Sequence, residues 1–155
     1  MFKIMFVCHG NICRSPMAEF IFKDLLKQKN LTDKYYVSSS ATSTEEIWNG
    51  IGNPVYPPAK AELLKHGIDC CEKRAVQVTA ADYNAYDLLV VMDSNNMRNI
   101  MRIIGSDPEG KVHKLLKFAN LDRDVSDPWY SGDFVTCYND ILSGCVALLD
   151  YLESK

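Results

Sequence analysis

One ten-residue segment, VCHGNICRSP at positions 7–16, constrains the fold of this chain more than any other. An apolar run leads into Cys8, and the loop that follows contains glycine and asparagine and ends at Arg14. Apolar residues then recur at helical spacing, with Ser15 suited to the N-cap and Pro16 to the first helical position. The segment therefore predicts a buried strand, a tight loop and a helix N-terminus, with a thiol and a guanidinium at the two ends of the loop.

Apolar runs alternate with helical patterns along the rest of the chain. Strands are predicted at residues 3–7, 35–39, 87–92 and 111–115, helices at 16–30, 59–65, 94–104 and 134–152, and long loops at 40–58 and 117–131. This alternation predicts an α/β fold: a single domain, residues 1–155, whose four-stranded parallel sheet has helices on both faces. Ligands of such sheets bind beyond the carboxyl ends of the strands, which is where Cys8 lies.

Charge and hydropathy exclude several classes of function. The chain has 17 Lys and Arg residues against 20 Asp and Glu, a net charge of −3, which gives no electrostatic support to nucleic-acid binding. No apolar run approaches the roughly 20 residues that span a bilayer. The N-terminus also lacks the apolar core and cleavage site of a signal peptide. We therefore expect a cytoplasmic protein with no nucleic-acid or membrane partner.

The six cysteines allow either a disulfide framework or free thiols. Cys70 and Cys71 are adjacent, no CxxC pair is present to chelate zinc, and no secretory signal is present, so reduced thiols are expected. Four of the thiols are expected to be structural: Cys70, Cys71, Cys137 and Cys145. Because histidines and carboxylates do not cluster in the sequence, no metal and no cofactor are predicted.

The loop after Cys8 has the composition of an anion-binding site. Its glycine and asparagine tolerate the left-handed conformations that turn backbone N–H groups inward, and the following helix adds its positive end. Arg14 supplies a planar fork that grips two phosphate oxygens, and the same field favours the thiolate form of Cys8. A phosphate-binding loop is thus predicted after the first strand, formed by His9, Gly10, Asn11, Ile12, Cys13, Arg14 and Ser15.

A thiolate under a bound phosphate is placed for in-line attack on phosphorus, which gives a phosphocysteine that water then hydrolyses. The alternative, a buried cysteine in a turn, leaves the combination of thiol, loop and guanidinium unexplained. The mechanism also needs an acid, and the loop contains no carboxylate. Asp127, followed by Pro128 and two aromatic residues, is the best candidate, but Asp-Pro is also common in turns, and spacing alone leaves both possibilities open.

The segment from Val7 to Glu19 closely resembles the signature of the low-molecular-weight protein tyrosine phosphatases. The sequence DPWY at 127–130 is similar to the acid loop of that family, and HGI at 66–68 and MDSNN at 92–96 match family-like segments. The resemblance implies a cysteine-dependent phosphatase that hydrolyses aryl phosphate monoesters without a cofactor and releases inorganic phosphate. Its expected partner is a phosphotyrosine-containing protein or a small aryl phosphate, and the expected state is a monomer.

By this resemblance Cys8 is the nucleophile, Arg14 holds the phosphate, and Asp127 is the general acid and later the base. Ser15 donates to the Cys8 thiolate and makes it a better leaving group. The loop itself is expected to be held by a set of hydrogen-bonding residues, namely Asn11, Ser15 and His66.

The substrate cleft is expected to be lined by His9, Trp48, Trp129 and Tyr130. The family often has two tyrosines in the acid loop, and because Trp129 replaces the first, only Tyr130 remains there as a tyrosine. Ile12 is similar to the residue of tyrosine phosphatases, whereas some relatives that act on phosphoarginine have threonine at that position. Ile12 therefore favours phosphotyrosine.

Cys13 allows two interpretations. It is either a small apolar residue behind the loop or, as the family implies, a resolving thiol that traps oxidised Cys8 as a reversible disulfide. The second interpretation is favoured, because a reactive, accessible thiolate is the target of oxidants.

Two alternative functions share this scaffold or its chemistry. An arsenate reductase needs two further redox cysteines just past the third strand, and residues 92–97 contain none. A sugar-transport phosphocarrier must keep its phosphocysteine, so it would not require the Arg14 clamp and a hydrolytic Asp127. Both alternatives are disfavoured.

Overall fold

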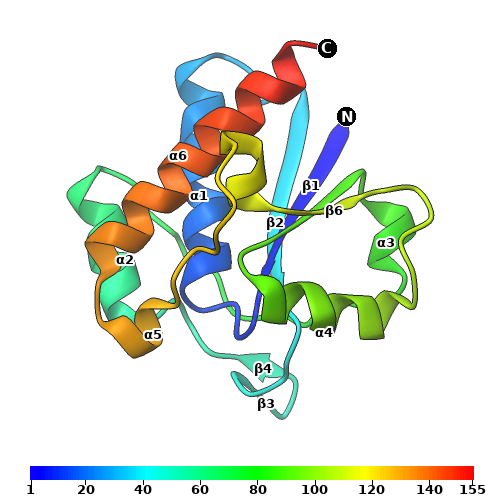
Figure 1. The fold of residues 1–155 in the computed structure, drawn as a ribbon. Helices are drawn as coiled ribbons and strands as arrows, with labels where there is room; N and C mark the ends of the chain where they lie inside the picture. The colour runs from blue at the N-terminus through cyan, green and yellow to red at the C-terminus, as the bar shows by residue number, and fades with distance from the viewer.

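A four-stranded parallel sheet lies at the centre of the computed structural model, which describes residues 1–155 (Figure 1). Its strands are β1 (Phe2–Cys8), β2 (Tyr35–Ala41), β5 (Leu88–Val91) and β6 (Val112–Lys114). They lie in the order β2-β1-β5-β6, and every neighbouring pair is parallel. The predicted α/β fold is confirmed, and β1, the strand that leads into the loop, is one of the two central strands.

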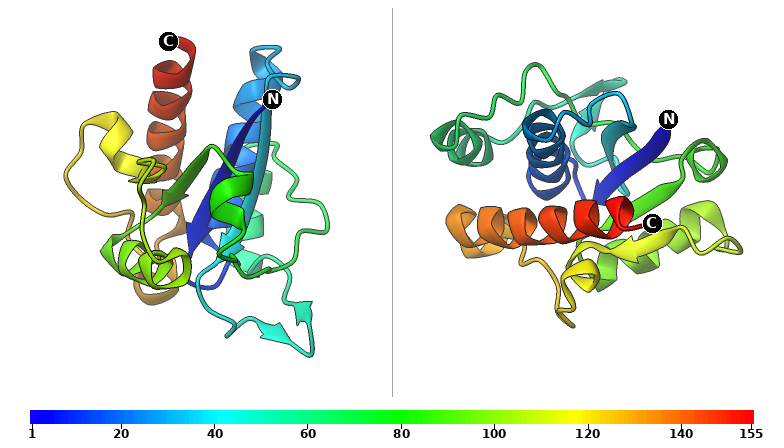
Figure 2. Two further views of the ribbon diagram at one scale, coloured as in Figure 1. Left: turned by 90° about the vertical axis from the view of Figure 1, so that its right-hand side faces the viewer. Right: turned by 90° about the horizontal axis from the view of Figure 1, so that it is seen from above.

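Helices cover both faces of the sheet. One face is covered by α1 (Arg14–Gln28) and α6 (Phe134–Glu153), with α2 (Pro57–Lys65) packed against these two helices, and the other by α3 (Asp82–Ala85) and α4 (Ser94–Ile104) (Figure 2). The alternation of β1 divides its side chains between two cores: Ile4, Phe6 and Cys8 join the first, and Met5 and Val7 the second. Cys8 is therefore the last side chain in the row of β1 that faces α1 and α6.

The ends of several elements differ from the prediction. Helix α1 begins at Arg14 with Cys13 at its N-cap position, so Ser15 is not the cap and its hydroxyl is available to another partner. Helix α2 begins two residues early, because Pro57 and Pro58 fit a first helical turn. Three short elements were predicted as loop or strand end: the antiparallel hairpin β3 (Ile47–Trp48) and β4 (Ile51–Gly52), the 3-10 helix η1 (Leu115–Ala119), and α5 (Pro128–Ser131).

The loop after β1 and the N-termini of α1, α4 and α5 meet at the carboxyl end of the sheet (Figure 1). This is the edge at which α/β sheets of this kind bind ligands. No helix in the structure combines the length and the apolar character needed to cross a membrane.

Candidate active site

The loop that joins β1 to α1 directs hydrogen-bond donors at the Cys8 sulfur. Asn11 has a φ of 60°, in the left-handed region that this residue tolerates. The backbone N–H groups of Asn11 and Ser15 donate to Cys8 Sγ at 3.3 and 3.4 Å, and Ser15 Oγ lies 2.9 Å from the same sulfur. A thiolate can only accept, so the Ser15 hydroxyl is the donor whenever Cys8 is ionised. Three donors on one sulfur stabilise the negative charge of a nucleophile.

Asn11 fixes the loop from inside. Its side-chain amide donates to Ser15 Oγ at 2.7 Å and to Ser39 Oγ at 2.9 Å, and its carbonyl oxygen accepts from the backbone N–H of Val76 at 3.1 Å. Asn11 is 1% exposed, so these bonds satisfy a fully buried amide. The predicted supporting role of Asn11 therefore has a structural basis, but its partners come from β2 and from the segment near Val76.

The prediction that His66 supports Asn11 is wrong. His66 follows α2 and stacks on Tyr138 of α6, with ring centroids 3.8 Å apart and planes inclined by 6°. Its Nε2 atom lies 3.2 Å from Glu62 of the same helix. The histidine thus joins α2 to α6 at a distance from the loop, and Ser39 takes the position under Asn11 that the prediction gave to His66.

A buried charged group lies behind Ser39, and the sequence analysis missed it. Ser39 Oγ donates to Glu19 Oε1 at 2.6 Å, and Glu19 also pairs with Lys23 at 2.6 Å. Lys73 donates to the Ser39 carbonyl at 2.9 Å and lies 3.9 Å from Glu19. Burial lowers the pKa of Lys73, and the nearby Glu19 opposes that effect. Two signals were available in the sequence: Glu19 ends the segment that resembles the family signature, and three hydroxyl side chains follow one another at 38–40.

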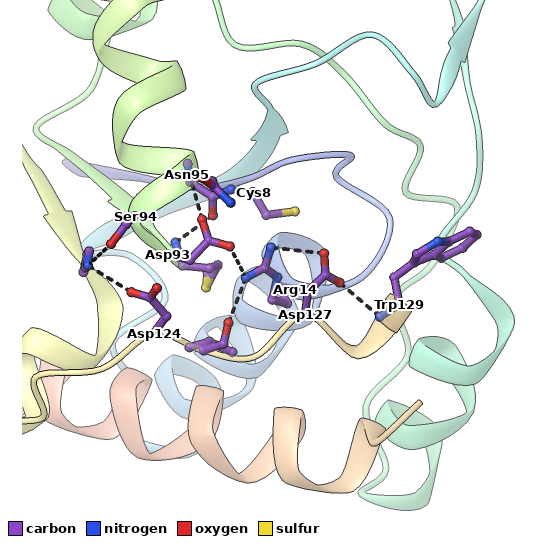
Figure 3. Close-up of polar contacts among 12 residues, drawn as sticks. Cys8, Arg14, Asp93, Ser94, Asn95, Asp124, Asp127 and Trp129 are labelled. Carbon is purple, nitrogen blue, oxygen red and sulfur yellow. Dashed lines mark hydrogen bonds and ion pairs between the residues drawn. The ribbon is translucent and has the colours of Figure 1, made fainter. Parts of the chain in front are cut away.

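Arg14 is held by two segments far away in the sequence (Figure 3). Its Nη1 donates to Asp93 Oδ2 and to the carbonyl of Val125, both at 2.8 Å, and its Nη2 lies 3.5 Å from Asp127 Oδ2. Burial acts against the charged form of Arg14, but the negative groups at Cys8, Asp93 and Asp127 outweigh it and raise the pKa of the guanidinium. A permanent, fixed positive charge therefore stands beside the thiol.

Asp127 reaches this site from the far end of the chain. Its Oδ1 accepts from the backbone N–H of Trp129 at 3.0 Å and so caps α5, while Oδ2 faces Arg14 (Figure 3). The side chain is 30% exposed, which leaves it in contact with the cavity and with solvent. Asp127 is thus a turn-forming cap, and its carboxylate also lies at the mouth of the site, where the catalytic interpretation requires it.

A cavity of about 140 Å³ opens over the loop. Its walls are formed by residues from three segments: Cys8, His9, Gly10, Ile12, Cys13, Arg14, Glu45, Glu46, Asp127, Trp129 and Tyr130. The structure therefore brings the predicted nucleophile, arginine, acid and two aromatic residues together. Glu45 and Glu46 were not predicted, and nothing in the sequence distinguished them from other acidic residues of a loop. Glu45 Oε2 lies 2.5 Å from His9 Nε2 at the rim.

Trp48 does not line this cavity, which corrects the predicted cleft. It lies on β3, pairs with Ile51 of β4 across the hairpin, and is 79% exposed. The prediction treated residues 40–58 as one loop, and a hairpin directs its side chains differently from a loop that folds over the site. The aromatic walls come from Trp129 and Tyr130 alone.

Cys13 shares the cavity with Cys8 and is 6% exposed. Burial, reinforced by the negative charge of Cys8, raises the pKa of Cys13 well above the usual range of a thiol. Cys137 on α6 is also buried, and burial raises its pKa to about 12. All six cysteines are free thiols, and no group of three or more histidine, cysteine or acidic side chains is arranged to hold a metal ion.

Comparisons with known proteins agree with this geometry. Residues 3–155 match the family described as "Low molecular weight phosphotyrosine protein phosphatase". The chain is 39% identical over 153 residues to the low molecular weight protein-tyrosine-phosphatase PtpA of Staphylococcus aureus, which covers 98% of this chain and 94% of PtpA.

Two solved structures are also similar. YfkJ from Bacillus subtilis superposes with a TM-score of 0.93 at 34% identity, covering 99% of this chain and 96% of YfkJ. The Drosophila arginine phosphatase DARP superposes with a TM-score of 0.86 at 27% identity, covering 97% of this chain and 98% of DARP.

Proposed function

The chain belongs to the low molecular weight phosphotyrosine protein phosphatase family, and from that premise we propose that Cys8, Arg14 and Asp127 perform its reaction. The protein is a cysteine-dependent hydrolase of aryl phosphate monoesters, and the family acts on phosphoproteins or phosphotyrosine. One observation supports the assignment of roles above all others. The Cys8 sulfur accepts two backbone hydrogen bonds and lies 2.9 Å from the Ser15 hydroxyl, in a cavity that also contains a buried arginine and a carboxylate.

In the first step the Cys8 thiolate attacks phosphorus in line with the ester oxygen. The S–P bond forms as the P–O bond breaks, and the protonated Asp127 gives its proton to the leaving phenolic oxygen. The backbone N–H groups of the loop, residues 9–15, and the Nη2 group of Arg14 hold the remaining phosphate oxygens, where charge develops. Asp93 and Val125 already bind Nη1, so Arg14 keeps its orientation during the step.

In the second step water attacks the phosphocysteine. The Asp127 carboxylate takes a proton from the water, the S–P bond breaks, and Cys8 leaves as a thiolate that accepts the hydrogen bond of Ser15. Inorganic phosphate is released. The two steps use Asp127 first as an acid and then as a base, which returns the enzyme to its starting state without a cofactor.

We propose phosphotyrosine as the substrate group, in a protein or as a small aryl phosphate. The supporting features are the aromatic walls formed by Trp129 and Tyr130 and the apolar Ile12, all of which line the cavity. Aromatic side chains favour an aryl ring through offset or edge contacts. Because DARP is named an arginine phosphatase, phosphoarginine is the substrate to be excluded.

Peptides of one sequence carrying phosphotyrosine, phosphoserine or phosphoarginine test this substrate assignment. We expect kcat/KM for phosphotyrosine to exceed that for each of the others by at least about 10-fold, because only the tyrosyl ring fills the apolar walls. Release of inorganic phosphate is measured in each case. If phosphoarginine is hydrolysed as fast as phosphotyrosine or faster, the phosphotyrosine assignment is wrong. If all three peptides are hydrolysed at equal rates, the aromatic walls do not select the substrate.

Cys13 is proposed as the thiol that protects Cys8 from irreversible oxidation. Peroxide converts the Cys8 thiolate to a sulfenic acid, and the Cys13 thiol then displaces water to form a disulfide, which an added dithiol reduces. The two thiols line one cavity, and the raised pKa of Cys13 leaves Cys8 as the more reactive of the two.

Treatment with peroxide and then with dithiothreitol tests this protection. Wild type is expected to recover most of its activity, whereas Cys13→Ala is expected to lose the larger part because its Cys8 proceeds to the sulfinic acid. Cys71→Ala, which removes an exposed thiol, serves as the control and is expected to recover like wild type. If Cys13→Ala recovers as fully as wild type, Cys13 has no protective role.

We further propose that residues 1–155 form one phosphatase domain that acts as a monomer in the cytoplasm. One central four-stranded sheet and a family match over residues 3–155 support the single domain. The proposed nucleophile, arginine and acid all come from one chain, so the proposed reaction requires no second copy. A nucleophile that must stay reduced supports a reducing compartment.

A further inference from the structure

Lys114 connects two segments that both hold Arg14, although it does not itself line the cavity. It is the last residue of β6, and its ammonium group donates to Ser94 Oγ at 2.6 Å and to Asp124 Oδ1 at 2.9 Å. Ser94 follows Asp93, which binds Arg14 Nη1, and Asp124 precedes Val125, whose carbonyl binds the same nitrogen. Figure 3 labels Ser94 and Asp124 on these two segments, and the dashed lines drawn from both residues end at the same side chain.

The loop that carries Asp127 has few other attachments. Leu121, Asp122 and Arg123 are exposed, and Val125 is the first buried residue after η1. The backbone N–H of Val125 donates to the Met92 carbonyl at 3.0 Å, and its own carbonyl accepts from Arg14. Asp127 follows only two residues later. On the far side, Pro128 is buried and Trp129 contacts Tyr56. The position of the Asp127 carboxylate therefore depends on these contacts and, on the near side, on how firmly the chain is held at 124 and 125.

Asp124 and its neighbour Arg123 form ion pairs with two different elements of the fold. Arg123 forms two bonds of 2.9 Å with the carboxylate of Asp140 on α6, whereas Asp124 pairs with Lys114 at the end of β6. The Arg123 pair ties the loop to α6, which packs behind the site. The Lys114 pair ties Asp124 to the end of β6 in the central sheet. Of the two ion pairs, only this one is made by the residue directly before Val125, whose carbonyl binds Arg14.

We propose that Lys114 is a positioning residue for catalysis: through Asp124 it holds the acid loop so that Asp127 reaches the leaving-group oxygen. The proposal rests on the proposed role of Asp127 as the general acid. Proton transfer needs the carboxyl group within hydrogen-bond reach of that oxygen, and small displacements of a catalytic group reduce the rate steeply. Lys114 and Asp124 are partly exposed, so the pair adjusts the position of the loop and the fold does not depend on it.

Replacement of Lys114 by methionine keeps the length of the side chain and removes its charge. We expect kcat to fall by about 3- to 10-fold on phenyl phosphate, a poor leaving group, and by less than 2-fold on 2,4-dinitrophenyl phosphate, which needs little protonation. Inhibition by inorganic phosphate should change by less than 2-fold, since the loop and Arg14 are unaltered. Lys114→Arg should restore most of the rate. A purely structural role would lower the rate on both substrates equally.

Two further variants identify the contact through which Lys114 acts. Asp124→Asn should reproduce the effect of Lys114→Met, and the double variant should be no slower than either, because both remove one contact. Ser94→Ala should change kcat by less than 2-fold. Lys117→Met, an exposed charge on neighbouring η1, is the matched control and should match wild type.

These measurements distinguish a failure of the Lys114 proposal from a failure of the role proposed for Asp127. If Asp127→Ala is fully active on phenyl phosphate, the role of Asp127 itself has failed. If Asp127→Ala is impaired but Lys114→Met and Asp124→Asn match wild type on phenyl phosphate, the positioning role of Lys114 is overturned. A Ser94→Ala variant as slow as Lys114→Met also overturns it, since Lys114 would then act through α4.

Discussion

Replacement of Cys8 by serine is expected to lower kcat on p-nitrophenyl phosphate by at least about 10⁴-fold, because removal of a covalent nucleophile eliminates the reaction path itself. The two backbone N–H groups and the Ser15 hydroxyl around Sγ stabilise a thiolate. A serine hydroxyl in the same place remains protonated at neutral pH and is a poor nucleophile. The measurement is the steady-state rate of nitrophenol release, with Cys71→Ser, at an exposed thiol, as the control.

The same variant should still bind the product. Arg14 and the loop that surrounds the anion are unchanged in Cys8→Ser, so the dissociation constant of inorganic phosphate, measured by calorimetry, is expected to stay within about 3-fold of wild type. Retained binding with lost turnover also makes this variant a trap for phosphotyrosine proteins. Turnover within about 10-fold of wild type would show that Cys8 is not the nucleophile, and loss of phosphate binding would show that the substitution had disrupted the loop.

Replacement of Asp127 by alanine is expected to lower kcat by about 10²- to 10⁴-fold on phenyl phosphate, the range that general acids typically contribute. The loss should be smaller on 2,4-dinitrophenyl phosphate, whose leaving group needs no proton. Phosphate binding should be retained or become tighter, since the substitution removes a carboxylate that lies 3.5 Å from Arg14. Rates on the two substrates and inhibition by phosphate test these three expectations together.

A control for this variant is available in the same loop. Asp122 is exposed, and Asp122→Ala removes an equal charge without touching the cavity. It should retain wild-type rates on both substrates. If Asp127→Ala stays within 2-fold of wild type on phenyl phosphate, the general acid is another group, and Glu45 and Glu46 are the remaining carboxylates of the cavity wall.

Features that depend on neighbouring residues in the sequence were predictable. The strand, loop and helix around Cys8 are encoded by one continuous segment, and the alternation of apolar and helical patterns was enough to predict the parallel sheet. Asp127 was identified mainly by resemblance, because its distance from Cys8 is set by the whole fold. Short elements such as α3 and α5 escaped prediction, since four residues carry too little periodicity to distinguish them from turns.

Contacts between distant segments were not predictable. The choice between His66 and Ser39 as the partner of Asn11 depends on the register of β2 against β1, in which Ser39 lies opposite Phe6. The exposure of Trp48 depends on a two-residue hairpin within an otherwise irregular stretch. Likewise, Lys114 pairs with Asp124 only because the end of β6 lies beside the acid loop, and no local pattern of charges predicts that the two segments are neighbours.

The dispersal of the site along the chain has a consequence for biosynthesis. Cys8 and Arg14 leave the ribosome early, whereas Asp127 and α6 are made late, and Arg14 finds its partner Val125 only then. Domains are synthesised from the N-terminus and fold as units, so a nascent or prematurely terminated chain carries the nucleophilic cysteine without the acid that completes a turnover. With the roles proposed for Cys8 and Asp127, full turnover therefore requires synthesis and folding of the chain beyond Asp127.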